Sequence, residues 1–485
     1  MSIDANLLSG LRAAVGPDAV LTSAEACVAY ECDALSAQRH VPDLVVLPAD
    51  AGEVRAVLDL CRRHATPVVA RGAGTGLSGG ALPVASGVLL VLSRLNRILE
   101  VDPDRRLARV QPGVTNLAIS EAAEPHGLFY APDPSSQVAC TIGGNVAENS
   151  GGVHCLKYGL TVHNLLEVRL ATLDGEEIVL GSETGESPGL ALLPLVTGSE
   201  GMLGVVLEVT VRLVPLPERV ELLMAAFGDV GRCADAVGRI IAAGILPAGL
   251  EMMDAPALRA AEAFAHCGYP QDAAALLLCE IDGLALDVES QLRAAESLLR
   301  DCGATEVRIA RNAAERARMW SGRKSAFPAV GRLAPDYFCM DGTIPRRHLA
   351  PVLARIGEMS REAGLPVANV FHAGDGNLHP LILFDAGTPG QLERAERLGA
   401  DILELCVAVG GTVTGEHGVG VEKLGPMCTQ FGEAELEAFH AVKRVFDPMG
   451  LLNPGKAVPT LARCADYGAM RVHGGKLPFP HLPRF

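Results

Sequence analysis

The stretch VVARGAGTGLSGGA, residues 68–81, is a glycine loop that directly follows a strand-like run of apolar residues. Its glycines have the G-x-G-x-x-G spacing of a Rossmann turn, but that turn leads straight into a helix whose N-terminus faces the pyrophosphate. Here LPVASGVLLVLS follows, in which Pro83 and Gly87 interrupt any helix before a β-rich run begins. We therefore interpret the loop as a nest of backbone N–H groups that wraps a diphosphate without a Rossmann unit.

Two further glycine-rich segments support this interpretation. They are PDPSSQVACTIGGNVAENSGGVHCLKYG, residues 132–159, and GSEGMLGVV, residues 198–206. The first is too polar for a core and too long for an ordinary connection, and long ordered loops are usually functional. Together the three segments can line one extended cofactor. A plain glycine-rich connector and an NAD-binding loop remain as alternatives for residues 68–81.

Composition limits the class of protein. With 485 residues, 49% of them apolar, the chain is expected to form two or three globular domains. A net charge of −16 without a basic stripe argues against nucleic-acid binding. No apolar run reaches the roughly 18 residues of a membrane span, and the N-terminus does not resemble a secretory signal. The 13 cysteines form no C-x-x-C motif, so we expect reduced thiols, no iron–sulfur cluster and a cytoplasmic location.

The order of predicted elements indicates two main domains. The first 35 residues look helical. Strands and loops then alternate with helices expected at 51–65 and 116–128, and a hairpin is expected around Asp174-Gly175, until a proline-ended strand near residue 217. The second half mixes helices with strands, which is typical of an α+β domain with an antiparallel sheet. Its helices are expected at 232–243, 286–302 and 391–409, and its strands at 275–281, 305–310 and 367–384. The predicted domains are 1–35, 36–217, 218–460 and a tail at 461–485.

The segment FHAGDGNLHP, residues 371–380, carries two histidines around an Asp-Gly pair. Asp-Gly between apolar runs predicts a two-residue type I′ hairpin turn. Such a turn at Asp375-Gly376 would place His372 directly opposite His379, with their Cβ atoms about 5 Å apart. The two imidazoles are then either core residues whose hydrogen bonds are satisfied by the protein or two ligands of a metal.

A third ligand is available in GGTVTGEHGVG, where Glu416 lies among glycines. Two imidazoles and one carboxylate suit Zn²⁺, and Mn²⁺ or Fe²⁺ less well, with coordination positions left open for a substrate. A metal-dependent hydrolase that activates water at these residues is one function compatible with this set.

The motifs, taken in order, resemble a known family. RGAGTGLSGGA, PDPSS, TIGGNVAENSGG and GSEGMLGVV are similar to the PCMH-type FAD-binding domain of vanillyl-alcohol-oxidase flavoenzymes. WSGRKSAFPAVGR, DYFCMDGTIPR, FHAGDGNLHP, GGTVTGEHGVG and VFDPMGLLNPGK resemble the C-terminal domain of FAD-linked 2-hydroxy-acid dehydrogenases, in particular the flavin subunits (D subunits) of bacterial glycolate oxidases. The resemblance runs from about residue 35 to the tail GAMRVHGGKLPFP. It implies a two-subdomain FAD-binding domain followed by an α+β substrate domain.

The resemblance also implies the residues that hold FAD. None of His64, Cys140 and His154 lies in a recognisable attachment motif, so the FAD is expected to be noncovalent. The implied cofactor residues are Arg71, Gly72, Gly74, Thr75, Gly76, Leu77, Ser78, Gly79, Pro132, Asp133, Ser136, Thr141, Gly143, Gly144, Asn145, Gly151, Gly152, Tyr158, Gly159, Glu200, Gly201, Gly204, Val206 and Asn453.

In the family, a divalent metal is bound where this sequence has His372, His379 and Glu416. His417, adjacent to Glu416, has the intrinsic pKa of a base near neutrality and is expected to take the hydroxyl proton; its alternative role is to support a metal ligand or to replace one.

Arg323 matches the family's substrate arginine, whose planar guanidinium can bind a carboxylate bidentately. A surface Arg323–Lys324 pair is the structural alternative. Asn377 is a plausible hydrogen-bonding group for the substrate. Relatives acting on a dicarboxylate carry a lysine where this sequence has Cys339, which favours a small monocarboxylate.

The implied activity is oxidation of glycolate, and of D-lactate, to the 2-oxo acid by hydride transfer to flavin N5. A second flavin subunit and an iron–sulfur subunit would carry electrons on to quinone, so the chain would reach the membrane only through its partners. A stand-alone D-lactate dehydrogenase and a noncatalytic FAD-binding subunit are the remaining alternatives.

Overall fold

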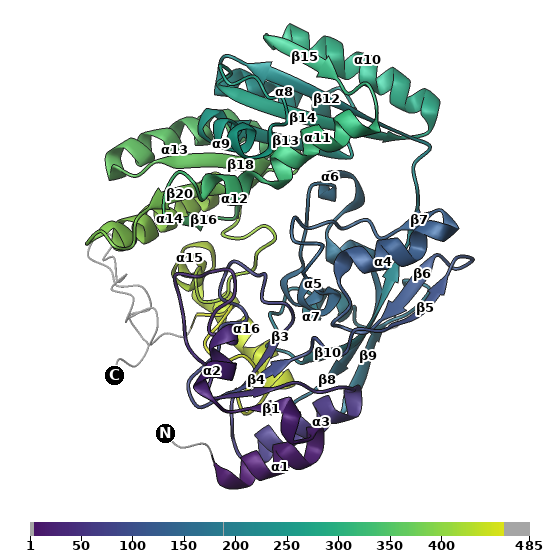
Figure 1. The fold of residues 1–485 in the computed structure, drawn as a ribbon, viewed down its shortest axis with the longest axis vertical. Coiled ribbons are helices and arrows are strands. Elements are labelled where there is room, and N and C mark those ends of the chain that lie inside the picture. The colour runs from purple at the N-terminus through teal and green to yellow at the C-terminus, as the bar shows by residue number, and fades with distance from the viewer. Residues whose placement is uncertain (1–3, 188, 460–485) are drawn as a thin grey trace. The chain divides into compact units, whose positions relative to one another are not determined.

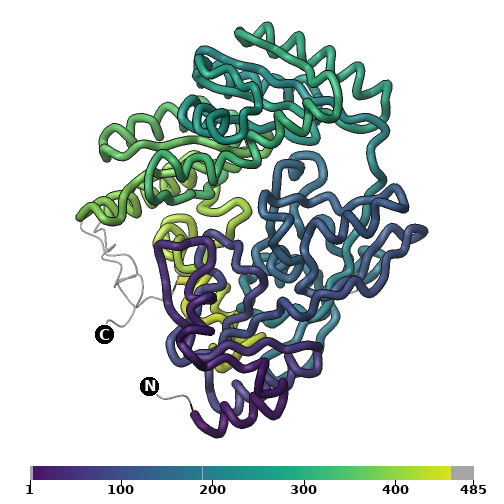
Figure 2. The backbone as a smooth tube through the Cα atoms, viewed as in Figure 1, coloured from purple at the N-terminus to yellow at the C-terminus, as the bar shows by residue number. Residues whose placement is uncertain are grey.

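The computed structural model describes residues 4–187 and 189–459, which form two compact units (Figure 1; Figure 2). Unit 1 contains the described residues up to Ser150, Leu160–Pro215 and those from His417 onward. Unit 2 contains Gly151–Gly159 and Leu216–Glu416. The predicted tail at 461–485 lies outside the described residues.

Unit 1 begins with a four-stranded sheet in the order β1-β2-β4-β3. Helix α3 covers it because Val54, Val57, Leu58 and Cys61 recur at helical spacing and are fully buried. Strand β3 pairs in parallel with β4 and ends where the glycine loop begins. The elements are α1 (Ala5–Val15), β1 (Val20–Leu21), β2 (Leu44–Val46), α3 (Ala51–Arg63), β3 (Val68–Arg71) and β4 (Val88–Val91).

The second sheet of unit 1 is antiparallel and has the order β5-β6-β10-β8-β9. The predicted hairpin around Asp174-Gly175 is confirmed, because β8 and β9 pair antiparallel across it and Gly175 has a φ of +80°. The elements are β5 (Ile98–Asp102), β6 (Leu107–Val110), α4 (Asn116–Ala123), β7 (Leu128–Phe129), α5 (Ile142–Glu148), β8 (Leu165–Ala171), β9 (Glu177–Gly181), β10 (Val205–Arg212), β11 (Val214–Pro215) and α16 (Glu433–Phe446).

Unit 2 is built on an antiparallel sheet in the order β15-β12-β14-β13-β18-β19-β17, which confirms the predicted sheet type. Alternate residues of β12 point to opposite faces. Leu222, Met224 and Ala226 share a core with α9, so α8 and α10, which also pack on β12, cover the other face (Figure 1). Burial on both faces explains why strands such as ALLLCEIDG are almost continuously apolar.

The elements of unit 2 agree with the helices expected from the sequence. The three predicted helices begin and end within two residues of α8, α10 and α14. The elements are α6 (Cys155–Tyr158), β12 (Arg219–Phe227), α8 (Val230–Ala242), β13 (Gly249–Asp254), α9 (Ala255–Ala265), β14 (Ala275–Gly283), α10 (Ala285–Asp301), β15 (Glu306–Ile309), α11 (Ala313–Lys324), α12 (Ala326–Val330), β16 (Asp336–Cys339), β17 (Gly342–Thr343), η5 (Arg346–His348), α13 (Leu349–Ala363), β18 (Val367–His372), β19 (Asn377–Leu378), β20 (Pro380–Phe384) and α14 (Gln391–Ala408).

The turn that joins β18 to β19 differs from the prediction. His372 pairs with Asn377 rather than with His379, so the connection is Ala373–Gly376 and the predicted type I′ register is wrong. Gly376 has a φ of +85°, whereas Asp375 is not among the residues with positive φ. The reason is local: an Asp375 carboxylate oxygen accepts the Asn377 N–H at 3.1 Å, and Gly376 N–H donates to the carbonyl of His372 at 3.1 Å.

Asp254 at the start of α9 makes the stability of unit 2 depend on pH. Its carboxylate accepts N–H groups of Ala257 at 3.1 Å and Asn369 at 2.9 Å, but burial raises its pKa from 3.8 to about 6. Between those pH values the folded state keeps a proton that the unfolded state loses, so stability falls as pH rises. We expect a loss of roughly 3 kcal/mol in the free energy of unfolding across this window.

Asp254→Asn should lack this slope, because an amide does not titrate. Urea unfolding of both proteins at pH 4, 5, 6 and 7 measures the difference. The amide NH₂ group faces two N–H donors, so a constant offset between the proteins is expected and does not affect the test. Parallel pH profiles for the two proteins would contradict the assignment.

Candidate active site

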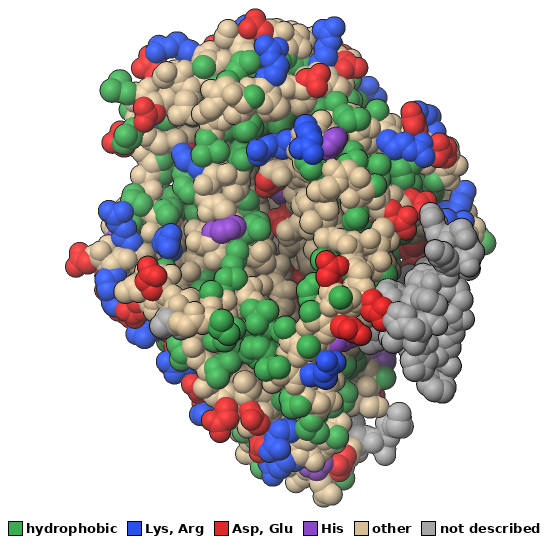
Figure 3. All heavy atoms as spheres, turned by 180° about the vertical axis from the view of Figure 1, so that it is seen from behind, with side chains coloured by type: hydrophobic (Ala, Val, Ile, Leu, Met, Phe, Trp, Pro, Cys, Tyr) green, Lys and Arg blue, Asp and Glu red, His purple; other side chains and the backbone are tan. Residues whose placement is uncertain are grey.

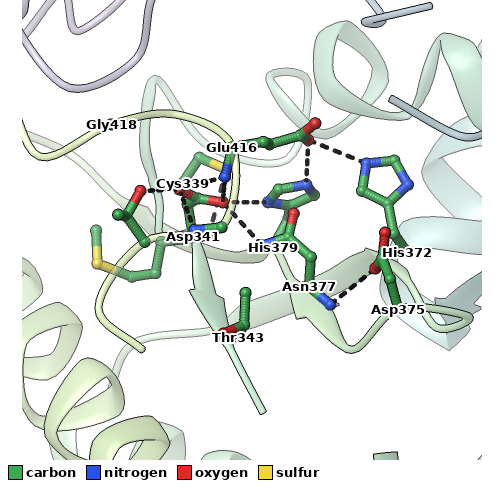
Figure 4. Close-up of polar contacts among 12 residues, drawn as sticks. Cys339, Asp341, Thr343, His372, Asp375, Asn377, His379, Glu416 and Gly418 are labelled. Carbon is green, nitrogen blue, oxygen red and sulfur yellow. Dashed lines mark hydrogen bonds and ion pairs between the residues drawn. The ribbon is translucent and has the colours of Figure 1, made fainter. Parts of the chain in front are cut away.

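The structure brings the three predicted metal ligands together within unit 2 (Figure 4). His372 ends β18 and pairs with Asn377, and His379 lies two residues beyond Asn377 on the same face. The Nε2 atoms of His372 and His379 lie 3.1 and 3.0 Å from the same Glu416 carboxylate oxygen. The two rings are 5.1 Å apart between centroids. His372 and His379 are therefore diagonal neighbours across the hairpin, and this arrangement brings their side chains together although they are not directly opposite.

Donor chemistry at this cluster fits a divalent metal. The ligand atoms of the three residues all lie within 4.8 Å of one another, and both histidines are buried. The Nδ1 of His372 lies 2.8 Å from a carboxylate oxygen of Glu251. A carboxylate on the outer nitrogen of a histidine orients the ring and strengthens its inner nitrogen as a ligand. Two imidazoles and one carboxylate are a common zinc set.

Electrostatics within the cluster point the same way. Burial opposes ionisation of Glu416, but the charge of His372 and the hydrogen bonds from both histidines outweigh it and hold the pKa of Glu416 well below its usual range. Burial also disfavours a charged His372, yet Glu251 and Glu416 raise the pKa of His372 well above its usual value. Glu251 and Glu416 thus favour a positive charge at His372, and a metal would displace the His372 proton on binding.

Glu251 connects the cluster to Arg323. Glu251 lies on β13 opposite His372 in the sheet register, and Arg323 lies near the end of α11. An Arg323 Nη atom is 2.7 Å from Glu251 Oε2, and both side chains are only 1% exposed. The structure therefore places the predicted substrate arginine in a buried chain that runs from Arg323 through Glu251 to His372.

Asp341 fixes the third ligand in a similar way. Its fully buried carboxylate accepts the Glu416 N–H at 3.1 Å, the Thr414 hydroxyl at 2.7 Å and the Asn377 amide at 2.8 Å (Figure 4). Asn377 is therefore held by its amide nitrogen, and its oxygen has no hydrogen-bond partner in the part of the chain that the structure describes. Neither Glu251 nor Asp341 was predicted. Glu251 is far from the motifs in sequence, and Asp341, although it lies in DYFCMDGTIPR, has no local pattern that indicates its role.

In unit 1 the glycine loop packs against the segment that begins α5. A Cβ added to Gly72 would lie 2.3 Å from the Thr141 hydroxyl oxygen, so only glycine allows this approach. Gly74 and Gly79 have φ values of +72° and +80°, which favour glycine. The loop thus has the backbone freedom that the predicted nest requires.

The other predicted segments of unit 1 meet around Asn453. Its side-chain amide donates to the carbonyls of Gly80 at 2.9 Å and Glu200 at 2.6 Å. The Glu200 carboxylate accepts the N–H groups of Val419 and Gly420, each at 2.7 Å. The glycine loop, the GSEG segment and the chain following His417 are therefore joined by direct hydrogen bonds.

The remaining predicted cofactor residues divide between the two units. Four of them, Gly151, Gly152, Tyr158 and Gly159, belong to the short segment of unit 2, where the Tyr158 hydroxyl donates to Asp282 at 2.5 Å. Those of unit 1 lie at the end of β3, in the glycine loop, in the segment before α5, in α5, or in and just before β10: Arg71, Thr75, Gly76, Leu77, Ser78, Pro132, Asp133, Ser136, Gly143, Gly144, Asn145, Gly201, Gly204 and Val206.

Comparison with known families fits both halves of the chain. Residues 216–457 match the family described as FAD linked oxidases, C-terminal domain, and residues 42–181 match the FAD binding domain. The chain belongs to the FAD-linked oxidases. The family resemblance and the FAD-binding domain predicted from the motifs are confirmed.

This chain is 61% identical over 480 residues to glycolate oxidase subunit GlcD of Escherichia coli K12. The match covers 99% of this chain and 96% of that protein. The chain is 38% identical to GlcD of Bacillus subtilis, over 92% of this chain and 96% of that one. It is 33% identical to D-lactate dehydrogenase of Archaeoglobus fulgidus, over 86% and 92% of the two chains.

A solved structure confirms the predicted fold class. The structure of p-cresol methylhydroxylase with substrate bound matches with a TM-score of 0.79 at 18% identity, over 94% of this chain and 97% of that one. At this identity the likeness concerns the fold, which is the PCMH-type, vanillyl-alcohol-oxidase-like architecture expected from the sequence.

Proposed function

We propose that this FAD-linked oxidase oxidises glycolate, and also D-lactate, to the corresponding 2-oxo acid. The observation that carries the proposal is the buried His372–His379–Glu416 cluster, in a chain that is 61% identical over nearly its whole length to a glycolate oxidase subunit. A D-lactate dehydrogenase is 33% identical over 86% of this chain, which supports D-lactate as a second substrate.

The metal is proposed to be Zn²⁺, with Mn²⁺ or Fe²⁺ as alternatives, held by His372, His379 and Glu416. The carboxylate and hydroxyl of the substrate would chelate a bound metal, and this coordination would lower the pKa of the hydroxyl. Glu251 keeps the Nε2 of His372 directed at the ligand position, and Asp341 holds the backbone of Glu416 in place. FAD, held noncovalently, supplies the hydride acceptor.

The proton and the carboxylate of the substrate are assigned to His417 and Arg323. His417 is proposed to accept the hydroxyl proton, since a histidine titrates near neutrality. The Nε of Arg323 is buried without a hydrogen-bond partner among the described residues, so a donor remains for the substrate carboxylate. Asn377, whose side-chain oxygen has no partner among the described residues, is proposed as a further hydrogen-bonding group beside the metal.

The partners follow from the same relatives. GlcD is named as a subunit of glycolate oxidase, so we propose that this chain also acts in a complex. A second flavin subunit and an iron–sulfur subunit would pass electrons to quinone, and the enzyme would be cytoplasmic with peripheral attachment to the membrane. No helix within the described residues is long and apolar enough to span a bilayer.

An anaerobic spectrum of the purified holoenzyme tests the proposal. Adding glycolate is expected to bleach the oxidised flavin band, and D-lactate to do so with a different rate constant. D-2-hydroxyglutarate, matched in concentration, should leave the band unchanged because Cys339 supplies no second cation. A flavin that responds only to D-lactate would favour a stand-alone D-lactate dehydrogenase. Protein that binds no FAD after reconstitution would overturn the proposal and favour the hydrolase.

A further inference from the structure

A hollow of 590 Å³ in unit 2 gathers four arginines. Arg232 and Arg239 come from α8, and Arg346 and Arg347 come from η5, directly before α13. The end of α10 completes the wall through residues 301–303. We call this feature the arginine hollow. It is formed by elements other than the strands and loop that carry the metal cluster.

The four guanidinium groups lack acidic partners. Within the described part of the chain, none of the four forms an ion pair with a carboxylate at 4.0 Å or less. Some exposed arginines of unit 2 are paired, as Arg293 is with Glu289 at 2.7 Å, and others, such as Arg361, are single charges outside any such hollow. With two aspartates in the lining, four arginines leave two positive charges in a chain whose net charge is −16. On the face drawn in Figure 3, acidic and basic side chains are interspersed.

Contacts with uncharged groups leave most of the donors unused. Arg239 donates to the Cys302 sulfur at 3.3 Å, and Arg347 donates its Nε to His348 at 3.1 Å. Arg232 lies against Gly303, where an added Cβ would be 2.7 Å from its Nη1. Each guanidinium has five N–H donors in a planar fork, so the hollow offers many more donors than the protein uses.

We propose that the arginine hollow binds a small polyanion with two or more phosphate or carboxylate groups. Guanidinium forks match these groups bidentately, and an anion would offset the repulsion among four like charges. The volume lies in the range of about 300–1,000 Å³ that holds small ligands, so a compact metabolite fits better than a flat protein surface.

Arg346 also connects the hollow to the hairpin that carries His372 and His379. Its Nη1 donates to the carbonyl of Gly374 at 2.8 Å. The test therefore leaves Arg346 intact, and uses Arg232→Gln with Arg347→Gln to remove two charges from the hollow. Arg293→Gln with Arg361→Gln removes two charges from exposed positions on α10 and α13 outside the lining and serves as the matched control.

Isothermal titration of the FAD-loaded protein with inorganic pyrophosphate, and separately with citrate, measures binding at constant ionic strength. We expect saturable binding that is weakened at least tenfold in the hollow variant and unchanged in the control variant. Binding of pyrophosphate alone assigns a phosphate ligand, and binding of citrate alone assigns a carboxylate. No saturable binding of either anion, or equal loss in both double variants, would overturn the proposal.

Pyrophosphate and citrate also bind metal ions, so titration alone does not show where the anion binds. Cys302 lines the hollow and therefore reports binding there. Alkylation of Cys302 by iodoacetamide, followed by peptide mass spectrometry, should slow at least threefold when the anion saturates. Cys32 of unit 1, which like Cys302 is half-buried, should be unaffected and serves as the internal standard. An unchanged rate at Cys302 with bound anion would place the anion elsewhere and refute the assignment. These outcomes do not depend on whether glycolate reduces the flavin.

Discussion

Replacing His372 by alanine is expected to lower kcat/KM for glycolate on the order of 1,000-fold, about 4 kcal/mol, while FAD remains bound. The variant loses one of the three proposed ligands and leaves the Glu251 carboxylate facing an empty space. Metal content by elemental analysis should fall below one tenth of the wild-type value. The flavin absorbance per chain should stay unchanged, because His372 is not among the residues predicted to hold FAD.

His348→Ala is the control, since His348 lies outside the cluster and contacts Arg347. It should retain metal, FAD and activity. If His372→Ala were reduced by glycolate at the wild-type rate, the metal would have no part in the reaction. If it lost FAD as well as metal, the substitution would have disrupted the fold and Glu416→Gln would replace it in the test.

Glu251→Ala is expected to destabilise unit 2 by about 3–5 kcal/mol, because it leaves the charge of Arg323 buried without compensation. Both side chains are 1% exposed, so solvent does not screen the remaining guanidinium. The variant should also bind zinc roughly 10- to 100-fold more weakly, since the outer nitrogen of His372 loses its carboxylate. Calorimetric unfolding and competition with a chromogenic chelator measure the two effects.

A double variant separates the two roles of Glu251. Glu251→Leu combined with Arg323→Met removes both charges and retains volume, so it should recover most of the lost stability. Its zinc affinity should stay low, because the carboxylate behind His372 is still absent. Equal stability of Glu251→Ala and the wild type would mean that the buried ion pair does not form in solution.

The sequence predicted that His372, His379 and Glu416 cluster, because each of these residues lies in a short motif. His372 and His379 flank one Asp-Gly pair, and Glu416 lies in a glycine-rich loop. Helix α3 could be predicted for a similar reason, since its buried residues Val54, Val57, Leu58 and Cys61 follow helical spacing. A local sequence pattern was sufficient to predict a feature wherever that feature depends on one segment of the chain.

The residues that support the ligands could not be predicted. Glu251 reaches His372 only because β13 pairs with β18, 121 residues along the chain, and strand order is not encoded in local periodicity. The hairpin register failed for a different reason. The Asp375 side chain competes for the Asn377 N–H and favours a longer turn than the Asp-Gly pair alone indicates.

Neither of the two units is continuous in sequence. A protease that cuts once beside Leu216, whose side chain is 46% exposed, would not release either unit. The N-terminal fragment would keep Gly151–Gly159, which packs in unit 2, and the C-terminal fragment would keep the residues from His417, which pack in unit 1. Each fragment would hold part of the other's core, so the nicked protein would stay assembled until it was denatured.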